Sequence, residues 1–138
     1  PYDLKQFPSI TNALGLVKFM FPNQYSIYLH DTPSKPLFDL EVRAFSHGCI
    51  RLQKPFEFAY ELLKPQTEDP KTTFNDAMAT GEETVVYLRQ PVPVHLIYRT
   101  AFVDELGAIN YRRDIYGRDA AIYEALIKAG IQAESFSG

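Results

Sequence analysis

The apolar residues of this chain occur in short runs separated by turn-forming residues, and this spacing constrains the fold more than any other feature. Residues 16–21 and 25–30 are aromatic and β-branched runs on either side of Pro22-Asn23-Gln24. Two such runs around a turn signal predict a β-hairpin. Further strand candidates follow at residues 83–89, 92–103 and 108–112, the last two joined by a predicted turn.

Helical periodicity is present in three places. Pro55 suits the first turn of a helix whose apolar residues recur at i, i+3, i+4 and i+7 and stop before Pro65. Residues 72–79 predict a second short helix. Asp119 is expected to cap a third that runs to Lys128 and ends at Gly130, with inward-facing Ile122, Leu126 and Ala129. Hairpins with a minority of helices predict a β-dominated α+β domain.

Composition excludes several classes of protein. The 138 residues are enough for one domain, residues 1–138, with an ordinary globular composition of 46% hydrophobic and 22% charged residues. A net charge of −3, with basic residues scattered singly and in pairs, argues against a nucleic-acid partner. No apolar run approaches the length of a membrane span. A single cysteine, Cys49, excludes a disulfide scaffold.

The densest chemical signal surrounds that cysteine. The segment reads Ser46-His47-Gly48-Cys49-Ile50-Arg51, and His30 lies upstream. A thiol acts as a nucleophile when its pKa is lowered or a base lies beside it, and both conditions fit this segment. The glycine is expected to let the backbone turn sharply, so that consecutive N–H groups point at one developing oxyanion.

This segment resembles the signature of YkuD-type L,D-transpeptidase catalytic domains, which is Ser-His-Gly-Cys-hydrophobic-Arg preceded by a histidine. Fifteen residues separate His30 from Ser46, within the spacing that the signature allows. The likeness covers roughly residues 12–125 and is greatest to the large Gram-negative YcbB-like branch. Besides the motif, the segments that carry it are residues 16–23, 27–33, 43–45, 91–94 and 114–119.

The resemblance implies a role for each residue of the motif. Cys49 is the expected nucleophile and His30 the expected general base, while His47 shapes the site. The backbone of Gly48 and Cys49 is expected to form an oxyanion hole, with Tyr28 as a further donor.

The resemblance also implies how substrate is held, and with what partners. Arg51 is expected to hold the loop or to bind a substrate carboxylate, and Ser46 to contact substrate. The partners implied are peptidoglycan peptide stems, with carbapenem β-lactams as inhibitors, and no cofactor. The implied compartment is the periplasm, although no signal peptide is visible in the sequence.

The implied reaction begins with attack of the Cys49 thiolate on the L-centred carbonyl of a tetrapeptide stem, which releases the terminal D-alanine. An amine of a second stem then accepts the acyl group in a 3→3 cross-link. Water as the acceptor would make the protein an L,D-carboxypeptidase, and the sequence does not separate the two. A non-catalytic wall-binding fragment is the remaining alternative.

Two other chemistries were weighed. His30, His47 and Cys49 are acceptable zinc ligands, but no second cysteine or Cys-x-x-Cys pair supports a metal site. A thiol phosphatase requires an arginine about six residues beyond its cysteine, whereas Arg51 follows Cys49 after one residue and Pro55 occupies the required position. The phosphatase is rejected.

The resemblance also raises an expectation about completeness. The family domain is a mixed β-sandwich with short helices packed on it, whereas this chain reaches His30 after an irregular segment, residues 1–12, and one hairpin. Residues 1–138 are therefore expected to be the C-terminal part of one catalytic domain. Upstream residues, another chain or another copy would supply the N-terminal strands, because an unpaired sheet edge is costly in water.

Overall fold

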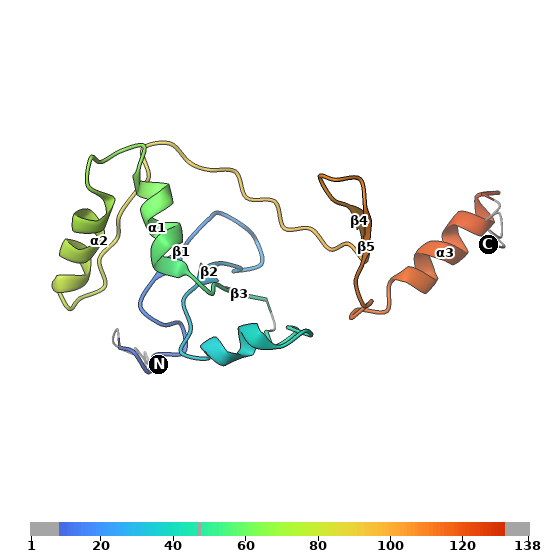
Figure 1. Cartoon of the computed structure of the whole chain (residues 1–138), viewed down its shortest axis with the longest axis horizontal. Coiled ribbons are helices and arrows are strands. Elements are labelled where there is room, and N and C mark those ends of the chain that lie inside the picture. The colour runs from blue at the N-terminus through green and yellow to red at the C-terminus, as the bar shows by residue number, and fades with distance from the viewer. Residues whose placement is uncertain (1–8, 47, 132–138) are drawn as a thin grey trace. The chain divides into compact units, whose positions relative to one another are not determined.

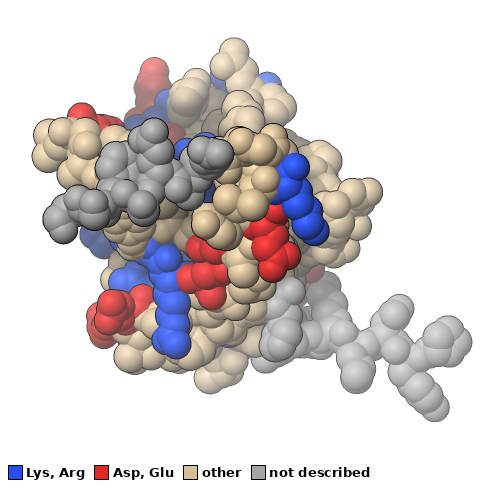
Figure 2. All heavy atoms as spheres, turned by 90° about the vertical axis from the view of Figure 1, so that its right-hand side faces the viewer, with Lys and Arg blue, Asp and Glu red and all other residues tan. Residues whose placement is uncertain are grey.

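The computed structural model describes residues 9–46 and 48–131, and the chain divides into two compact units, residues 1–94 and 95–138. The elements are labelled in Figure 1. Basic and acidic side chains are interspersed among uncharged ones on the face shown in Figure 2. Among the described residues, no helix combines the length and the apolar character needed to cross a bilayer.

The first unit contains a small mixed sheet with strand order β1-β2-β3. β1 (Lys18–Phe19) pairs antiparallel with β2 (Leu29–His30), which confirms the predicted hairpin with shorter strands. β3 (Ile50–Arg51) pairs parallel with β2. No strand was expected in this segment, because its pairing comes from a strand 20 residues upstream rather than from a local pattern.

Two helices supply the core of this unit. α1 (Pro55–Leu63) begins at the predicted proline, and α2 (Pro70–Ala79) begins two residues before the predicted start. The Asp69 carboxylate accepts a hydrogen bond from the Thr72 backbone N–H at 3.0 Å and so caps α2. The buried hydrophobic residues of the core cluster are Ala59, Leu63 and Phe74, packed by Val17, Phe19, Phe56, Tyr60, Met78 and Leu88.

The core joins the helices to the sheet through aromatic side chains. The Phe19 ring of β1 meets the Phe58 ring of α1 edge-on at 4.9 Å between centroids. The Phe74 ring of α2 lies 5.2 Å from Phe56 and 5.5 Å from Tyr60, both on α1. Such pairs contribute about 0.5–1.5 kcal/mol beyond area burial. The Phe19–Phe58 pair holds α1 against β1, and the two Phe74 pairs hold α2 against α1.

Other segments also differ from the expectations. A 3-10 helix, η1 (Lys35–Asp39), forms where no helix was expected. Residues 83–89 form no strand, and of residues 92–103 only the last three do. Alternating β-branched residues make a segment suitable for a strand, but a strand also requires a neighbouring backbone to pair with. Among the described residues, residues 83–89 and 92–100 pair with no neighbouring strand.

The second unit contains the other predicted hairpin and helix. β4 (Ala101–Val103) and β5 (Ile109–Tyr111) pair antiparallel, and α3 spans Asp119–Lys128. Gly107 closes the turn with a φ of +83°, a conformation that favours glycine. The Asp104 carboxylate accepts the Leu106 and Ala108 N–H groups at 3.0 and 2.9 Å. Gly130 ends α3 with a φ of +82°, as predicted.

The cap of α3 differs from the prediction. Asp119 is the first helical residue, and Asp114 accepts its N–H at 2.8 Å. The Tyr98 hydroxyl donates to the same carboxylate at 2.6 Å. The Asp119 N–H and then the Tyr98 hydroxyl lower the pKa of Asp114 to about 2. The apolar residues that were expected to face inward are exposed in the described unit: Ile122, Leu126 and Ala129.

The fold class is mixed α+β, with small sheets and three α-helices. Among the described residues more lie in helices than in strands, so β-dominance is not established. Many large apolar side chains are exposed among the described residues. They include Val85, Tyr87, Val92, Leu96 and Ile97.

Candidate active site

Cys49 is positioned by the parallel pairing of β2 and β3. Leu29 lies opposite Ile50 and His30 opposite Arg51, so Tyr28 and Cys49 are the preceding pair. The Ile50 N–H donates to the Tyr28 carbonyl at 3.0 Å at this point. Because alternate residues of a strand point to one face, Tyr28, His30, Cys49 and Arg51 share a face of the sheet. The structure thus brings the predicted nucleophile to the side of the sheet that carries the predicted base.

Tyr28 contacts both of these groups. Its hydroxyl is near enough to Cys49 to interact with the thiol, and its ring lies edge-on to the His30 ring at 5.9 Å between centroids. The hydrogen bond to Cys49, then burial, then the negative charge of the thiolate raise the pKa of Tyr28. The phenol therefore keeps its proton at neutral pH and is available as a donor beside the sulfur.

His30 is buried, with 4% of its surface exposed, and its ring is oriented by the next peptide group. The Nδ1 atom forms a short contact with the Asp31 carbonyl oxygen. A carbonyl oxygen only accepts, so Nδ1 carries the proton and Nε2 of the neutral ring keeps its lone pair. This arrangement is the one a general base needs.

A shallow pocket of about 310 Å³ opens at the sulfur. The loop of residues 21–27 forms one wall, through Tyr25 and Ser26, and Ser46, Gly48 and Cys49 form the other. Ser26 has a φ of +54°, the left-handed region that non-glycine residues seldom adopt. Its carbonyl oxygen lies 4.0 Å from the Cys49 sulfur, as the acceptor of the thiol hydrogen. A strained residue that presents its carbonyl to a thiol is typical of a functional site.

The side chain of Asn23 holds this loop. Its Nδ2 donates to the Phe21 and Ile27 carbonyls at 3.0 and 2.7 Å, and its Oδ1 accepts the Tyr25 and Ile27 N–H groups at 3.0 Å each. One exposed amide therefore replaces four backbone partners that a tight turn lacks. The sequence marked Asn23 as a turn residue but gave no sign of this role.

The turn before Cys49 is closed by Ser46. Its hydroxyl donates to the Cys49 carbonyl at 2.5 Å and accepts from the Gly48 N–H at 3.4 Å. The structure thus gives Ser46 contacts within the turn.

The backbone bends at Gly48, as expected. Its φ is not in the left-handed region, and an added Cβ would meet only the Ile27 side chain at 3.9 Å. The predicted role of His47 falls on a residue outside those described. Arg51 is half-buried in β3.

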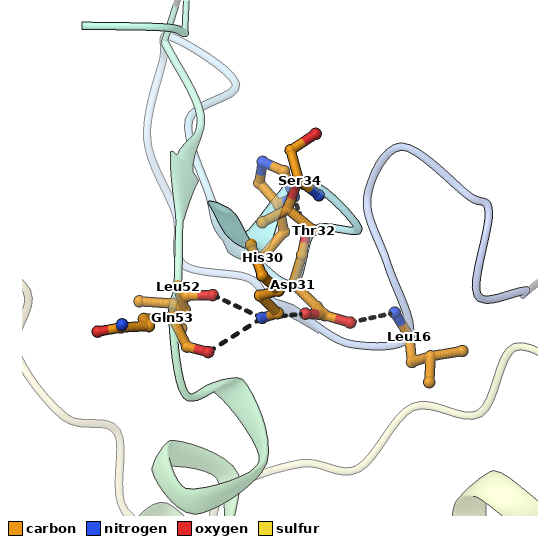
Figure 3. A network of polar contacts seen from close by, with 8 residues as sticks. Leu16, His30, Asp31, Thr32, Ser34, Leu52 and Gln53 are labelled. Carbon is orange, nitrogen blue, oxygen red and sulfur yellow. Dashed lines mark hydrogen bonds and ion pairs between the residues drawn. The ribbon is translucent and has the colours of Figure 1, made fainter. Parts of the chain in front are cut away.

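A buried carboxylate organises the other side of His30 (Figure 3). Asp31 is 7% exposed, and its two oxygens accept the Leu16 N–H at 3.0 Å and the Lys35 ammonium at 2.7 Å. Lys35 also donates to the carbonyls of Leu52 and Gln53, both at 3.0 Å. Burial acts to raise the pKa of Asp31, but Lys35 and the Leu16 and Thr32 backbone outweigh it, so the pKa lies below its ordinary value.

No set of three metal-binding side chains converges among residues 9–46 and 48–131. The zinc alternative included His47, which is not among them, so the described geometry leaves only His30 and Cys49 of that set.

Sequence comparisons identify the family. Residues 1–94 match YkuD, the L,D-transpeptidase catalytic domain. The chain is also 38% identical over 122 residues to the "Putative L,D-transpeptidase" of Haemophilus influenzae. That alignment covers 88% of this chain and 24% of the relative, so the chain spans about a quarter of the relative's length. A family match over more than half of the chain places this protein in the YkuD family of L,D-transpeptidase catalytic domains.

Proposed function

We propose that this chain carries the catalytic machinery of a peptidoglycan L,D-transpeptidase, with Cys49 as nucleophile and His30 as general base. One observation carries the proposal. The His30 ring is held with its proton on Nδ1 against the Asp31 carbonyl, which leaves Nε2 as acceptor on the sheet face that also carries the Cys49 thiol.

The proposed reaction has two steps. Nε2 of His30 takes the thiol proton, and the thiolate attacks the carbonyl of the L-centred third residue of a tetrapeptide stem. The amide bond to the terminal D-alanine breaks, the protonated imidazole returns its proton to the leaving amine, and a thioester remains. The side-chain amine of a second stem then attacks the thioester, and the thiol is restored as the 3→3 cross-link forms.

Donors for the developing oxyanion come from groups near the sulfur. The Tyr28 hydroxyl is one, because its raised pKa keeps it protonated beside Cys49. The Gly48 and Cys49 N–H groups are the proposed others, although the Gly48 N–H faces the Ser46 hydroxyl at 3.4 Å and must exchange that weak partner for the oxyanion. Arg51 is proposed to bind a substrate carboxylate, with Ser46 and Tyr28 contacting the stem.

The test is intact-mass measurement after exposure to a carbapenem, whose strained amide is a substitute for the stem carbonyl. One adduct is expected, and Cys49→Ala should abolish it. His30→Ala should slow acylation strongly, whereas His95→Ala, on an exposed residue of the second unit, should acylate at the unaltered rate. A persistent adduct on Cys49→Ala would refute the assignment of the nucleophile.

The acceptor is decided by a second experiment. A tetrapeptide stem is incubated with the protein, and its products are separated by mass. A cross-linked dimer supports transpeptidation, and a tripeptide with free D-alanine supports the L,D-carboxypeptidase alternative. Release of no D-alanine together with retained binding to peptidoglycan would favour a non-catalytic wall-binding role.

We place the protein in the periplasm and in the large YcbB-like branch of the family. Peptidoglycan stems are extracytoplasmic substrates, which supports the compartment. The proposal of the YcbB-like branch, whose members are large, is supported by the similarity to the Haemophilus influenzae protein. The aligned region is only 24% of that protein's length.

We further propose that strands from outside residues 1–138 complete the sheet of this catalytic domain. The three strands of the first unit have two residues each, and large apolar side chains such as Val85 and Val92 are exposed among the described residues. Such surfaces are usually covered. Residues 1–138 alone should be oligomeric or slow to acylate, and a chain extended upstream should be monomeric and fast. A monomer with cooperative unfolding and an unchanged acylation rate from residues 1–138 would contradict this.

A further inference from the structure

We propose that Lys35 and Asp31 act as a positioning pair for His30, fixing the peptide group that orients its ring. The inference rests on the proposed function, since it takes His30 to be the base of Cys49. In the described part of the chain, the side chains of Lys35 and Asp31 bond to each other and to backbone groups rather than to the Cys49 sulfur. Their role would be exerted through the Asp31 carbonyl, the acceptor of the His30 Nδ1 proton.

The geometry at Lys35 is that of a saturated cation. A lysine ammonium has three donors. Lys35 directs them at three acceptors: the Asp31 carboxylate at 2.7 Å and the Leu52 and Gln53 carbonyls at 3.0 Å each. Asp31 directly follows β2, and the two carbonyls directly follow β3. One side chain thus ties together the ends of the strands that carry His30 and Cys49.

Asp31 extends the connection to a third segment. Its other oxygen accepts the Leu16 N–H at 3.0 Å, just before β1. Gly15 lies so close that a Cβ there would come within 3.0 Å of the carboxylate. The Asp31 side chain is therefore held by the Leu16 N–H and by Lys35, and the space beside it at Gly15 admits no side chain. Its own carbonyl, which faces His30, is held with it.

This pair differs from an ordinary surface ion pair. Lys64 and Glu61 lie 2.5 Å apart with side chains 59% and 65% exposed, and exposed pairs of this kind contribute little to stability. The Asp31 side chain is 10% exposed and accepts a backbone N–H as well as Lys35. Loss of Lys35 would leave a mostly buried charge with a weakened anchor, and the peptide after His30 would be free to shift.

The consequence is a rate effect. A displacement of about 1 Å at a reacting group can lower a rate about 100-fold, so loosening this peptide should lower the reactivity of Cys49 about 10- to 100-fold. The decrease in Cys49 reactivity should be proportional to the fraction of molecules in which the His30 ring no longer faces the thiol and can no longer take its proton. It should therefore change the pH profile of the thiol reaction as well as its rate.

The experiment measures alkylation of Cys49 by iodoacetamide between pH 5 and pH 10, with carbapenem acylation in parallel. Cys49 is the only cysteine, so the adduct is unambiguous. Lys35→Met and Asp31→Asn are compared with Lys64→Met, the matched control that breaks an exposed pair on α1. Lys35→Arg keeps a charge and several donors. All variants are assayed well below the midpoint of their thermal unfolding.

We expect Lys35→Met and Asp31→Asn to shift the profile toward that of His30→Ala, with an unchanged profile for Lys64→Met and substantial recovery in Lys35→Arg. The double variant of Lys35 and Asp31 should be no slower than the slower single variant, because both act through one peptide.

An unshifted profile in folded Lys35→Met would overturn the inference. Should that variant not fold, Lys35→Gln keeps two donors without the charge, and an unshifted profile there has the same meaning. A profile that is identical in the parent and in His30→Ala would instead refute the proposed function, so the two failures are distinguishable.

Discussion

Gly15 offers the sharpest test of how the Asp31 carboxylate is held. Its φ is +64°, and an added Cβ would come closer than 3.0 Å to three atoms of the Asp31 side chain. In Gly15→Ala the left-handed backbone costs about 1–2 kcal/mol. The carboxylate must also move away, which breaks the charged hydrogen bond from the Leu16 N–H, a loss of about 1.5–3 kcal/mol. We count nothing for the Lys35 ion pair, because that side chain is 41% exposed. The expected loss in the free energy of unfolding is about 2.5–5 kcal/mol.

The same unit contains a matched control. Gly81 has a φ of +69°, and an added Cβ there would meet nothing within 4 Å. Gly81→Ala therefore includes the backbone cost alone, about 1–2 kcal/mol. The difference between the two variants, about 1.5–3 kcal/mol, isolates the displacement of Asp31.

Urea unfolding followed by circular dichroism measures both losses, and alkylation of Cys49 under native conditions measures the effect on the site. We expect Gly15→Ala to be the less stable variant and the slower to alkylate, and Gly81→Ala to alkylate at the parent rate. Equal losses of stability, with Cys49 unaffected in both, would refute the reasoning that the close approach of Gly15 holds Asp31.

Three further predictions concern residues near Cys49 and His30. Asn23→Ala removes four hydrogen bonds from the loop of residues 21–27. Carbapenem acylation should then require higher inhibitor concentrations, while alkylation by the small iodoacetamide changes little. An unchanged dependence of acylation on carbapenem concentration would contradict this role. Tyr28→Phe keeps the ring contact with His30 but removes the hydroxyl near Cys49. The acylation rate should fall about 10- to 100-fold, because an oxyanion donor is lost. An unaltered acylation rate would exclude the hydroxyl as an oxyanion donor. The pKa of Asp31 is lower folded than unfolded, so the stability it contributes is present above the ordinary value of 3.8 and is lost as the pH falls through the folded value. The difference in unfolding free energy between the parent and Asp31→Asn should accordingly shrink in acid, and a difference that stays constant from pH 7 to pH 3 would show that ionisation is not involved.

Local signals explain which elements were predictable from the sequence. The hairpin around Pro22, the helix that begins at Pro55 and the turn that ends at Gly107 are each specified by residues next to one another, and all three are present. β3 was not predicted, because its partner lies 20 residues away and its two residues carry no alternation of their own. Residues 83–89 have the composition of a strand, but composition does not supply a partner.

The site divides in the same way. Cys49, His30 and Tyr28 were all predicted through the resemblance of one motif and its surroundings, and the structure places the three on one face of the sheet. Asn23 and Lys35 act on backbone groups, and no sequence pattern distinguishes a lysine that binds carbonyls from one in solvent. The spacing of Asp31 and Lys35, four residues apart, was the one available signal, and it is common to many exposed pairs.

The register of β2 against β3 places the side chains of His30 and Cys49 on one face of the sheet. Strands this short specify their register only weakly. A slip of one residue would turn Cys49 to the opposite face from His30, since successive side chains alternate. Two backbone hydrogen bonds oppose that slip, from Ile50 to Tyr28 at 3.0 Å and from Leu52 to His30 at 2.8 Å. Lys35 adds a restraint of a different kind, because its bonds to Asp31 and to the carbonyl of Leu52 span the two strands at a fixed offset. With strands of two residues each, the Lys35 side chain, bonded to groups that follow both strands, helps to keep Cys49 and His30, the proposed nucleophile and base, on one face.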